Sequence, residues 1–305
     1  MEGRRIAVVT GAAGFTGAIL VEQLIENGYE VYAIVRPESE HNARLSLLGR
    51  SVHMVEMDLK ELSNLSEFIP QIGDNDYGIL FHLAWTGGKA FEKQYSNVKY
   101  TLDAVRATES IGCHRIVCTG SQAEYGVVPP DETIYEDRKL SPFSHYGSAK
   151  VAACYLSRTL AMELGVDWIW GRIFSVIGKY EPSGRMLPDL YASLKRGEAF
   201  SLSSCKQNWD YLDVYDAADA LIALGERGVS GNIYNIANGD YKPLREFTEE
   251  LHVMVNPGTE IVYGNDPEPF VSLQPSVEKI RMDTGWMAKR GLKDSVRGYL
   301  HGFFK

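Results

Sequence analysis

The chain has 305 residues, of which 45% are hydrophobic and 23% charged, and its formal net charge is −9. This length fits one large α/β domain or a nucleotide-binding domain with a smaller lobe, and the composition is that of a globular protein with a sizeable core. A protein whose main partner is nucleic acid normally carries a basic face, and the sequence has no Lys/Arg cluster of that kind, so no nucleic-acid partner is expected.

The start of the chain and its cysteines favour a cytoplasmic location. The N-terminal MEGRRIAVVT runs straight into a strand, without the apolar segment that follows the basic start of a secretory signal. No apolar stretch is long enough to span a bilayer, so no membrane association is expected. The spacing of Cys113, Cys118, Cys154 and Cys205 matches no zinc site or redox motif, which predicts buried free thiols and no metal.

Strands and helices alternate through the first part of the chain. RIAVVT (5–10) is a short β-branched run, and the helix after it ends at Gly28. Further strands are predicted at 30–35, 52–59, 78–85, 115–121 and 167–178, with helices at 92–111 and 147–165. Strands alternating with helices of this length form βαβ crossovers. We therefore predict an α/β fold with a Rossmann-type doubly wound parallel sheet, and a dinucleotide-binding domain over residues 1–178.

The pattern loosens from about residue 180. Short helices are predicted at 187–196, 214–226 and 243–255, and NIYNIA (232–237) returns as a strand. Residues 179–305 are therefore interpreted mainly as a smaller α/β substrate-binding lobe that is partly interwoven with the core.

A glycine-rich turn joins the first strand to its helix. Gly11, Gly14 and Gly17 in TGAAGFTG permit a tight turn, and the helix N-terminus offers free N–H groups to a pyrophosphate. A purely structural turn is the alternative, but the position between strand and helix favours a bound dinucleotide.

The end of the second strand indicates which dinucleotide is bound. An acidic residue there typically bonds the ribose 2′-hydroxyl of NAD, whereas an arginine suits the 2′-phosphate of NADP. Here Arg36 follows the strand and Arg44 comes shortly after, which favours NADP(H), although NAD(H) stays possible and Arg36 could be a solvated charge. Asp58 could accept a hydrogen bond from the adenine amino group, or could simply be a turn residue.

Tyr146 and Lys150 form the candidate catalytic pair. They stand four residues apart at the start of a predicted helix, so both lie on one face. A tyrosine that acts as acid or base near neutral pH needs its phenolate stabilised, since its free pKa is about 10, and a lysine one turn away provides this. Ser121 ends the fifth strand, where open α/β sheets place their ligands, and could bond a substrate oxygen.

Together with Asn97 in SNVKYT, these motifs resemble the extended short-chain dehydrogenases/reductases, which include nucleotide-sugar epimerases, dehydratases and 4-ketoreductases. The resemblance covers essentially the whole chain. It implies Ser121, Tyr146 and Lys150 as the catalytic set, and a role for Asn97 in the hydrogen-bond network, against a surface asparagine as the alternative. It also implies a homodimer formed through helices 92–111 and 147–165.

The resemblance extends the expected site to further residues. Beyond the glycines, Arg36, Asp58 and the catalytic pair, the expected cofactor contacts are Phe15, Thr16, Leu59, Leu83, Ala84 and Ile173. Beyond Ser121, the expected substrate contacts are Trp85, Gln122, Ser175, Arg185 and Trp209.

Two departures from the family pattern narrow the reaction. At the motif that follows the fifth strand, dehydratases of the family look like Thr-Asp-Glu, whereas this chain has Ser121-Gln122-Ala123. Glu124 is acidic but comes one residue later, so its side chain is expected to point elsewhere. Trp209 replaces an arginine that often contacts the substrate pyrophosphate in epimerases. It could stack on a base or pack in the core, and Arg185 or Arg281 could replace that cation or be surface charges.

The expected reaction is therefore reduction of the 4-keto group of a nucleotide-linked 6-deoxy sugar. GSQAEYG and QNWDY resemble a subgroup with 4-keto-6-deoxy nucleotide-sugar reductases. An epimerase reuses one bound NAD, whereas a reductase draws on NADPH, so Arg36 favours net reduction. A 4-epimerase is the second hypothesis. A non-catalytic NADP-binding regulator is the third, although it would be expected to lack part of the Ser/Tyr/Lys set.

Overall fold

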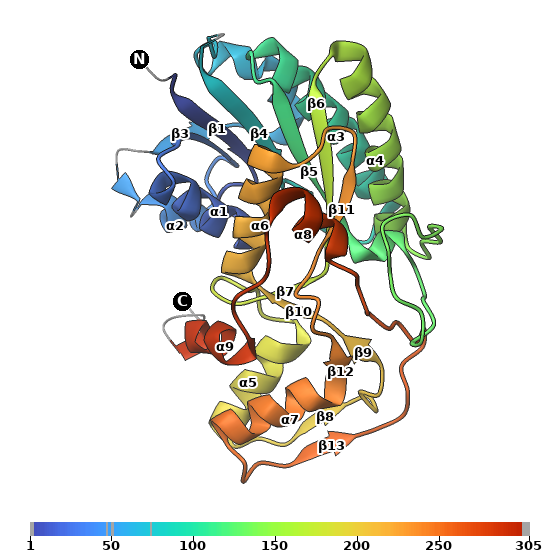
Figure 1. Cartoon of the computed structure of the whole chain (residues 1–305). Helices are drawn as coiled ribbons and strands as arrows, with labels where there is room; N and C mark the ends of the chain where they lie inside the picture. The colour runs from blue at the N-terminus through green and yellow to red at the C-terminus, as the bar shows by residue number, and fades with distance from the viewer. Residues whose placement is uncertain (1–2, 47, 50–51, 74, 301–305) are drawn as a thin grey trace.

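A seven-stranded parallel sheet forms the upper half of the molecule (Figure 1). The computed structural model describes residues 3–46, 48–49, 52–73 and 75–300. The sheet has the strand order β11-β6-β5-β4-β1-β2-β3, and every neighbouring pair in it is parallel. This confirms the predicted fold class. The strands are β1 (Arg5–Thr10), β2 (Glu30–Val35), β3 (Val52–Glu56), β4 (Tyr77–His82), β5 (Arg115–Ser121), β6 (Asp167–Ile173) and β11 (Ile233–Ile236).

Helices cover both faces of the sheet because the strand side chains are apolar on both faces. On β1, Ala7 and Val9 pack in one core cluster with α1 (Phe15–Glu26) and α6 (Val214–Arg227). Ile6 and Val8, which alternate with them, pack in the second cluster with α3 (Phe91–Ser110) and α4 (His145–Leu164). The remaining helical segments of this half are α2 (Ala43–Ser46), η1 (Glu40–Asn42), η3 (Leu59–Glu67), η4 (Gln122–Glu124) and α8 (Glu278–Thr284).

The predicted strand at 167–178 is wrong in one respect, because the chain forms two strands there. β6 ends at Ile173, and the N–H of the buried Phe174 donates to Ile236 at 3.0 Å. After Phe174 the chain leaves the large sheet, and β7 (Ser175–Ile177) pairs with β10 (Tyr211–Asp213). The strands predicted at 52–59 and 78–85 are also shorter than expected, since β3 ends at Glu56 and β4 at His82.

The lower half of the molecule contains the shorter elements (Figure 1). They are α5 (Met186–Arg196), α7 (Leu244–Val255), α9 (Leu292–Leu300), β8 (Phe200–Leu202), β9 (Asn208–Trp209), β12 (Lys242–Pro243) and β13 (Ile261–Tyr263). Between them the chain returns to the large sheet, where α6 packs on α1 and β11 pairs with β6. The division of the chain at residue 178 stays a prediction.

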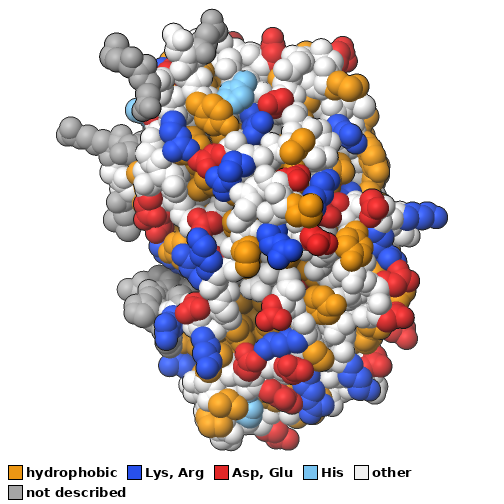
Figure 2. Space-filling model, in the orientation of Figure 1, with side chains coloured by type: hydrophobic (Ala, Val, Ile, Leu, Met, Phe, Trp, Pro, Cys, Tyr) orange, Lys and Arg blue, Asp and Glu red, His pale blue; other side chains and the backbone are white. Residues whose placement is uncertain are grey.

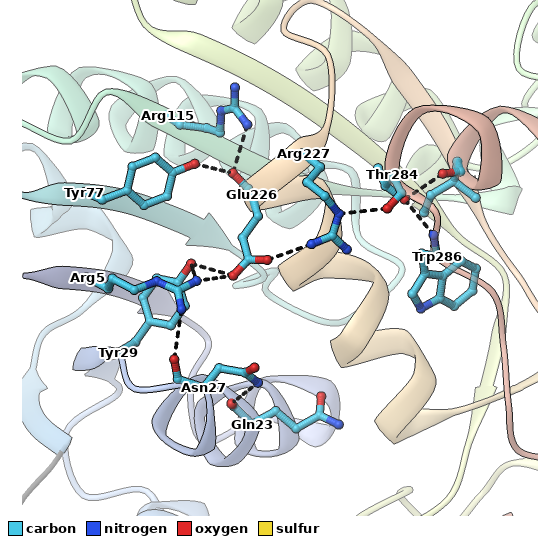
Figure 3. A network of polar contacts seen from close by, with 12 residues as sticks. Arg5, Gln23, Asn27, Tyr29, Tyr77, Arg115, Glu226, Arg227, Thr284 and Trp286 are labelled. Carbon is cyan, nitrogen blue, oxygen red and sulfur yellow. Dashed lines mark hydrogen bonds and ion pairs between the residues drawn. The ribbon is translucent and has the colours of Figure 1, made fainter.

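A polar network fastens the end of α6 to the sheet (Figure 3). The Glu226 carboxylate pairs with Arg5 of β1 and accepts from the Tyr29 hydroxyl at 3.1 Å. Arg227 donates to Glu226 at 2.9 Å and to the Thr284 carbonyl at 2.8 Å, which brings the end of α8 into the same network. A helix late in the sequence is thereby tied to the first strand.

Figure 2 shows basic and acidic side chains interspersed over the face seen in Figure 1. Within the described part of the chain, no helix has both the length and the apolarity to cross a bilayer. All four cysteines are free and buried, which confirms that prediction.

Candidate active site

A cavity of about 520 Å³ lies at the carboxyl ends of β1, β2, β3 and β4. It brings together several predicted cofactor residues, namely Gly11, Gly14, Arg36, Asp58, Leu59 and Ala84, and its lining also includes Trp85, Thr86 and Tyr100. Ligands of open α/β sheets bind at this edge of the sheet. The other predicted cofactor residues are not among its lining residues, namely Phe15, Thr16, Gly17, Leu83, Tyr146, Lys150 and Ile173.

The glycines of the turn are required by close backbone approach. Gly11 has φ +70°, and a Cβ there would meet the Ala84 backbone at 2.9 Å. A Cβ on Gly17 would meet the Gly11 carbonyl oxygen at 2.1 Å. Gly14 is the N-cap of α1 and provides no side-chain acceptor for the first-turn N–H groups. The turn therefore presents a tight backbone cradle and a helix N-terminus to the cavity, which fits a pyrophosphate.

The part of the cavity next to the end of β2 is lined by polar and basic side chains. Arg36, Ser39, His41 and Asn42 stand there together. Burial lowers the pKa of His41, and the neighbouring Arg44 and Arg36 lower it further. Of the two arginines, only Arg36 lines the cavity. Arg44 donates to the Ala13 carbonyl at 3.0 Å, which holds it against the glycine turn.

Asp58 is partly engaged by its own helix cap. It is the N-cap of η3, and its Oδ1 accepts from the Lys60 N–H at 3.0 Å. The residue still lines the cavity, so both readings of Asp58, adenine contact and turn residue, are compatible with its position.

Ser121 and Tyr146 face one another where β5 ends and α4 begins. The helix starts at His145 because the Ser144 hydroxyl caps it, accepting from the Gly147 N–H at 3.1 Å. Tyr146 therefore stands in the first turn, with 36% of its surface exposed. Burial of the phenol raises the pKa of Tyr146, and a hydrogen bond with Ser121 opposes that shift. The pair is placed to act together on one substrate oxygen.

Lys150 lies one turn further along α4 and is buried, with 3% of its surface exposed. Its Nζ donates to the Thr119 carbonyl at 2.7 Å and lies 5.9 Å from the centre of the Tyr146 ring. Burial lowers the pKa of Lys150 to about 7, although the charge of Glu124 acts in the opposite direction. The ammonium is thus held between the strand that carries Ser121 and the tyrosine.

Glu124 points away from the cavity, as its position suggested, into a buried network that the sequence did not reveal. Its carboxylate accepts from the Ser121 N–H at 2.9 Å, from the Trp170 indole at 3.0 Å and from Arg172 Nε at 2.7 Å. Arg172 is buried beside it and also donates to the Tyr125 hydroxyl at 2.9 Å. Glu124 therefore fixes the backbone at Ser121 through this buried network.

The loop after β4 is fastened to α3 by two buried amides. Asn97 accepts from the Thr86 N–H at 2.8 Å and donates to the Thr86 carbonyl at 3.0 Å, so it is not a surface asparagine. Gln94 accepts from the Trp85 indole at 2.9 Å and donates to the Gly88 carbonyl at 2.6 Å. Sequence reasoning did not single out Gln94, because its role depends on how the loop folds back.

The residues expected to contact substrate lie at different depths. Gln122 and Ser175 are half-buried, in η4 and β7. Arg185 donates to the Val176 carbonyl at 3.1 Å and pairs with Glu181 at 3.3 Å. Burial raises the pKa of the phenols of Tyr146 and Tyr211, and the charge of Arg185 opposes that rise in both. Arg185 therefore carries its charge close to the catalytic phenol.

Trp209 and Arg281 differ in what surrounds them. Trp209 packs against two apolar clusters while its indole nitrogen is buried with no hydrogen-bond partner among the described residues. Arg281 is exposed on α8, a helix that packs on α6 and β11.

The comparisons with known proteins agree on one family. The family model described as the NAD dependent epimerase/dehydratase family matches residues 7–237. The dTDP-6-deoxy-L-talose 4-dehydrogenase (NAD(P)(+)) of Kitasatospora kifunensis is 28% identical over 313 residues, covering 96% of this chain and 93% of that protein. UDP-glucuronic acid decarboxylase 3 of Arabidopsis thaliana is 26% identical, covering 95% and 86%. The solved UDP-glucose 4-epimerase of Thermotoga maritima, 22% identical, has the same fold, with a TM-score of 0.83 and coverage of 97% and 98%.

Proposed function

Because the chain belongs to the NAD dependent epimerase/dehydratase family, it is an NAD(P)-dependent enzyme, and we propose that it reduces the 4-keto group of a nucleotide-linked 6-deoxy sugar with NADPH. The observation that carries the proposal is Arg36 in the lining of the cavity, together with Ser39, His41 and Asn42. A cation at the adenosine end suits the 2′-phosphate of NADP, and a reductase consumes NADPH at each turnover.

The catalytic groups suit a reduction without elimination of water. Tyr146 and Ser121 face the same space. Glu124, the first carboxylate after Ser121 in the sequence, is paired with Arg172 and accepts a hydrogen bond from the Ser121 N–H. No acid pair therefore stands beside the phenol at the β5 motif. The relatives include a dehydrogenase, a decarboxylase and an epimerase by name, so similarity alone does not choose the reaction. The dehydrogenase is named for the 4-position of a 6-deoxy sugar, which supports the proposed substrate class.

The residues would share the work as follows. The glycine turn and Arg36 hold the cofactor, which supplies the hydride when bound. Ser121 donates a hydrogen bond to the sugar O4 and sets its position beside Tyr146. The Tyr146 phenol then gives its proton to O4 as charge develops there, and Lys150 stabilises the phenolate that is left. Arg185 offers a positive charge for the substrate phosphates close to this centre.

The test is oxidation of NADPH, followed by absorbance at 340 nm, with a panel of 4-keto-6-deoxy nucleotide sugars. We expect turnover with NADPH, slower turnover with NADH, and a product reduced at C4. Tyr146→Phe provides the matched control, because it keeps the ring but has no proton to transfer. An enzyme that instead retains NAD and interconverts C4 epimers without net oxidation would refute the reductase and establish the epimerase.

A further inference from the structure

Lys150 carries a buried charge with little compensation. Among the described residues, no carboxylate forms an ion pair with this ammonium, because Glu124, whose charge acts on it, is paired with Arg172. The groups that influence it or face it are Glu124 from η4, Cys118 from β5, His82 from β4 and Tyr146 from its own helix. Burial holds His82 neutral, lowering its pKa to about 3, and keeps the Cys118 thiol protonated by raising its pKa to about 12.

The remaining face of the ammonium is covered by an aromatic ring. Lys150 Nζ lies 3.6 Å from the centre of the Trp85 ring, the closest distance between a cation and an aromatic ring among the described residues. At this separation the electron-rich face of an indole attracts a cation strongly, and the attraction grows when both groups are shielded from water. The same indole packs against Tyr146 in a T-shaped arrangement with 5.9 Å between centroids and an interplanar angle of 88°.

The position of Trp85 is set by side chains outside the catalytic pair. Gln94, which is 2% exposed, accepts the indole hydrogen bond, and Asn97, which is 1% exposed, binds both backbone groups of Thr86. The indole plane is therefore fixed before any ligand arrives. Supporting hydrogen bonds of this kind are typical of a side chain that holds a functional group in position.

We propose that Trp85 is a positioning residue of the catalytic pair: its indole face holds the Lys150 ammonium, and its T-shaped contact with Tyr146 orients the phenol ring. The inference rests on the proposed function only in taking Tyr146 and Lys150 as the groups that manage the proton. The loop after β4 then contributes to catalysis indirectly, because Gln94 and Asn97 hold Trp85 in place and Trp85 holds the lysine.

Three variants separate the aromatic face from simple packing. Trp85→Leu removes the face and keeps apolar bulk, whereas Trp85→Phe keeps a smaller aromatic face and loses the bond to Gln94. Gln94→Leu leaves the indole in place but frees it to tilt. Because loss of a shielded cation–π contact disfavours the charged lysine, we expect Trp85→Leu to lower the pKa of Lys150 by about one unit. Trp85→Phe should shift it by less than half as much, and Gln94→Leu by an intermediate amount.

The direct readout is a pH titration by NMR of protein labelled with [ε-¹³C]lysine, in which the Lys150 signal is identified by its loss in Lys150→Arg. NADPH affinity at pH 8, followed by cofactor fluorescence, should fall about tenfold in Trp85→Leu and less in Trp85→Phe. Neither readout needs a substrate, so an inactive protein with these shifts would refute the proposed function and leave the inference standing. An unchanged Lys150 titration in Trp85→Leu, or equal shifts in the leucine and phenylalanine variants, would overturn it. If Trp85→Leu does not fold, a Lys150 shift in Gln94→Leu that is no larger than in Trp85→Phe would overturn the inference, and a larger one would support it.

Discussion

Replacing Glu124 with glutamine should destabilise the protein strongly while leaving its chemistry recognisable. Arg172 and Glu124 are 1% and 0% exposed at their side chains, and their closest atoms are 2.7 Å apart. The glutamine keeps the shape and the acceptor for Ser121 and Trp170, but it presents N–H groups to the Arg172 guanidinium. The arginine would then be a buried charge whose other bonds reach only the Tyr125 hydroxyl and the Glu136 carbonyl.

The expected loss in unfolding free energy follows from that exposure. Breaking a buried ion pair by removing one partner costs about 3–5 kcal/mol, and the unfolding entropy expected for 305 residues means that each kcal/mol lowers the melting temperature by roughly 1.5–2 °C. We therefore expect a fall of roughly 5–10 °C in a thermal melt, with a matching loss in urea.

The double variant Glu124→Gln/Arg172→Met should recover much of that stability, because it removes the uncompensated charge. Activity should be measured on the folded fraction at a temperature well below the melt. We expect kcat of Glu124→Gln to stay within about tenfold of the wild type, since its carboxylate contacts the candidate catalytic set only through the backbone N–H of Ser121. A melting temperature within about 2 °C of wild type would refute this structural role. A complete loss of turnover in well-folded protein would instead point to a direct part for Glu124 in the chemistry.

Five further variants each change one residue. Arg36→Ala should weaken NADPH binding tenfold or more and leave NADH binding nearly unchanged in fluorescence titrations, because a charge-assisted contact to phosphate contributes on the order of 1.5–3 kcal/mol. Tyr146→Phe should lower kcat about a hundredfold or more with NADPH affinity retained, and Ser121→Ala should be milder, as steady-state assays can check. Glu226→Ala should cost about 1–2 kcal/mol in urea unfolding, since it unfastens the end of α6 from Arg5 and leaves other contacts in place. Burial lowers the pKa of Lys150 to about 7 from 10.5, so between these pH values the unfolded chain binds a proton that the folded chain does not. The free energy of unfolding should therefore rise with pH over this range. Lys150→Met should remove this dependence when unfolding is measured between pH 7 and 9.

The sheet could be predicted because each of its strands is a short buried run flanked by helices. β1, β2 and β5 have the predicted limits, since Gly11 and Gly28 mark a turn and a helix end by their own conformational needs. The split after Ile173 could not be predicted, because the apolar run continues through Val176 and Ile177. Only the pairing of Ser175 with Tyr211, a contact between distant segments, separates β7 from the large sheet.

The candidate site shows the same limit at the level of side chains. Ser121, Tyr146 and Lys150 stand out because their types and spacings imply chemistry before any fold is known. Gln94 and Arg172 carry no such signal, since their partners lie at Trp85 and Glu124 and meet them only in the folded chain. Trp85 was expected at the substrate, and its ring lies against the catalytic lysine. Sequence spacing predicts the candidate reacting groups, whereas the groups that hold them depend on long-range packing.

The four buried thiols offer a means of timing how the protein opens. Cys113, Cys118 and Cys154 sit in the core cluster between the sheet and helices α3 and α4, and Cys205 is buried in the segment between β8 and β9. Burial raises the pKa of each of them, so a thiol reagent reacts only after the surrounding structure has opened. Labelling at Cys205 ahead of the other three would show the lower half loosening while the sheet stays closed. A saturating nucleotide sugar that slows Cys205 alone would locate the bound ligand without a crystal.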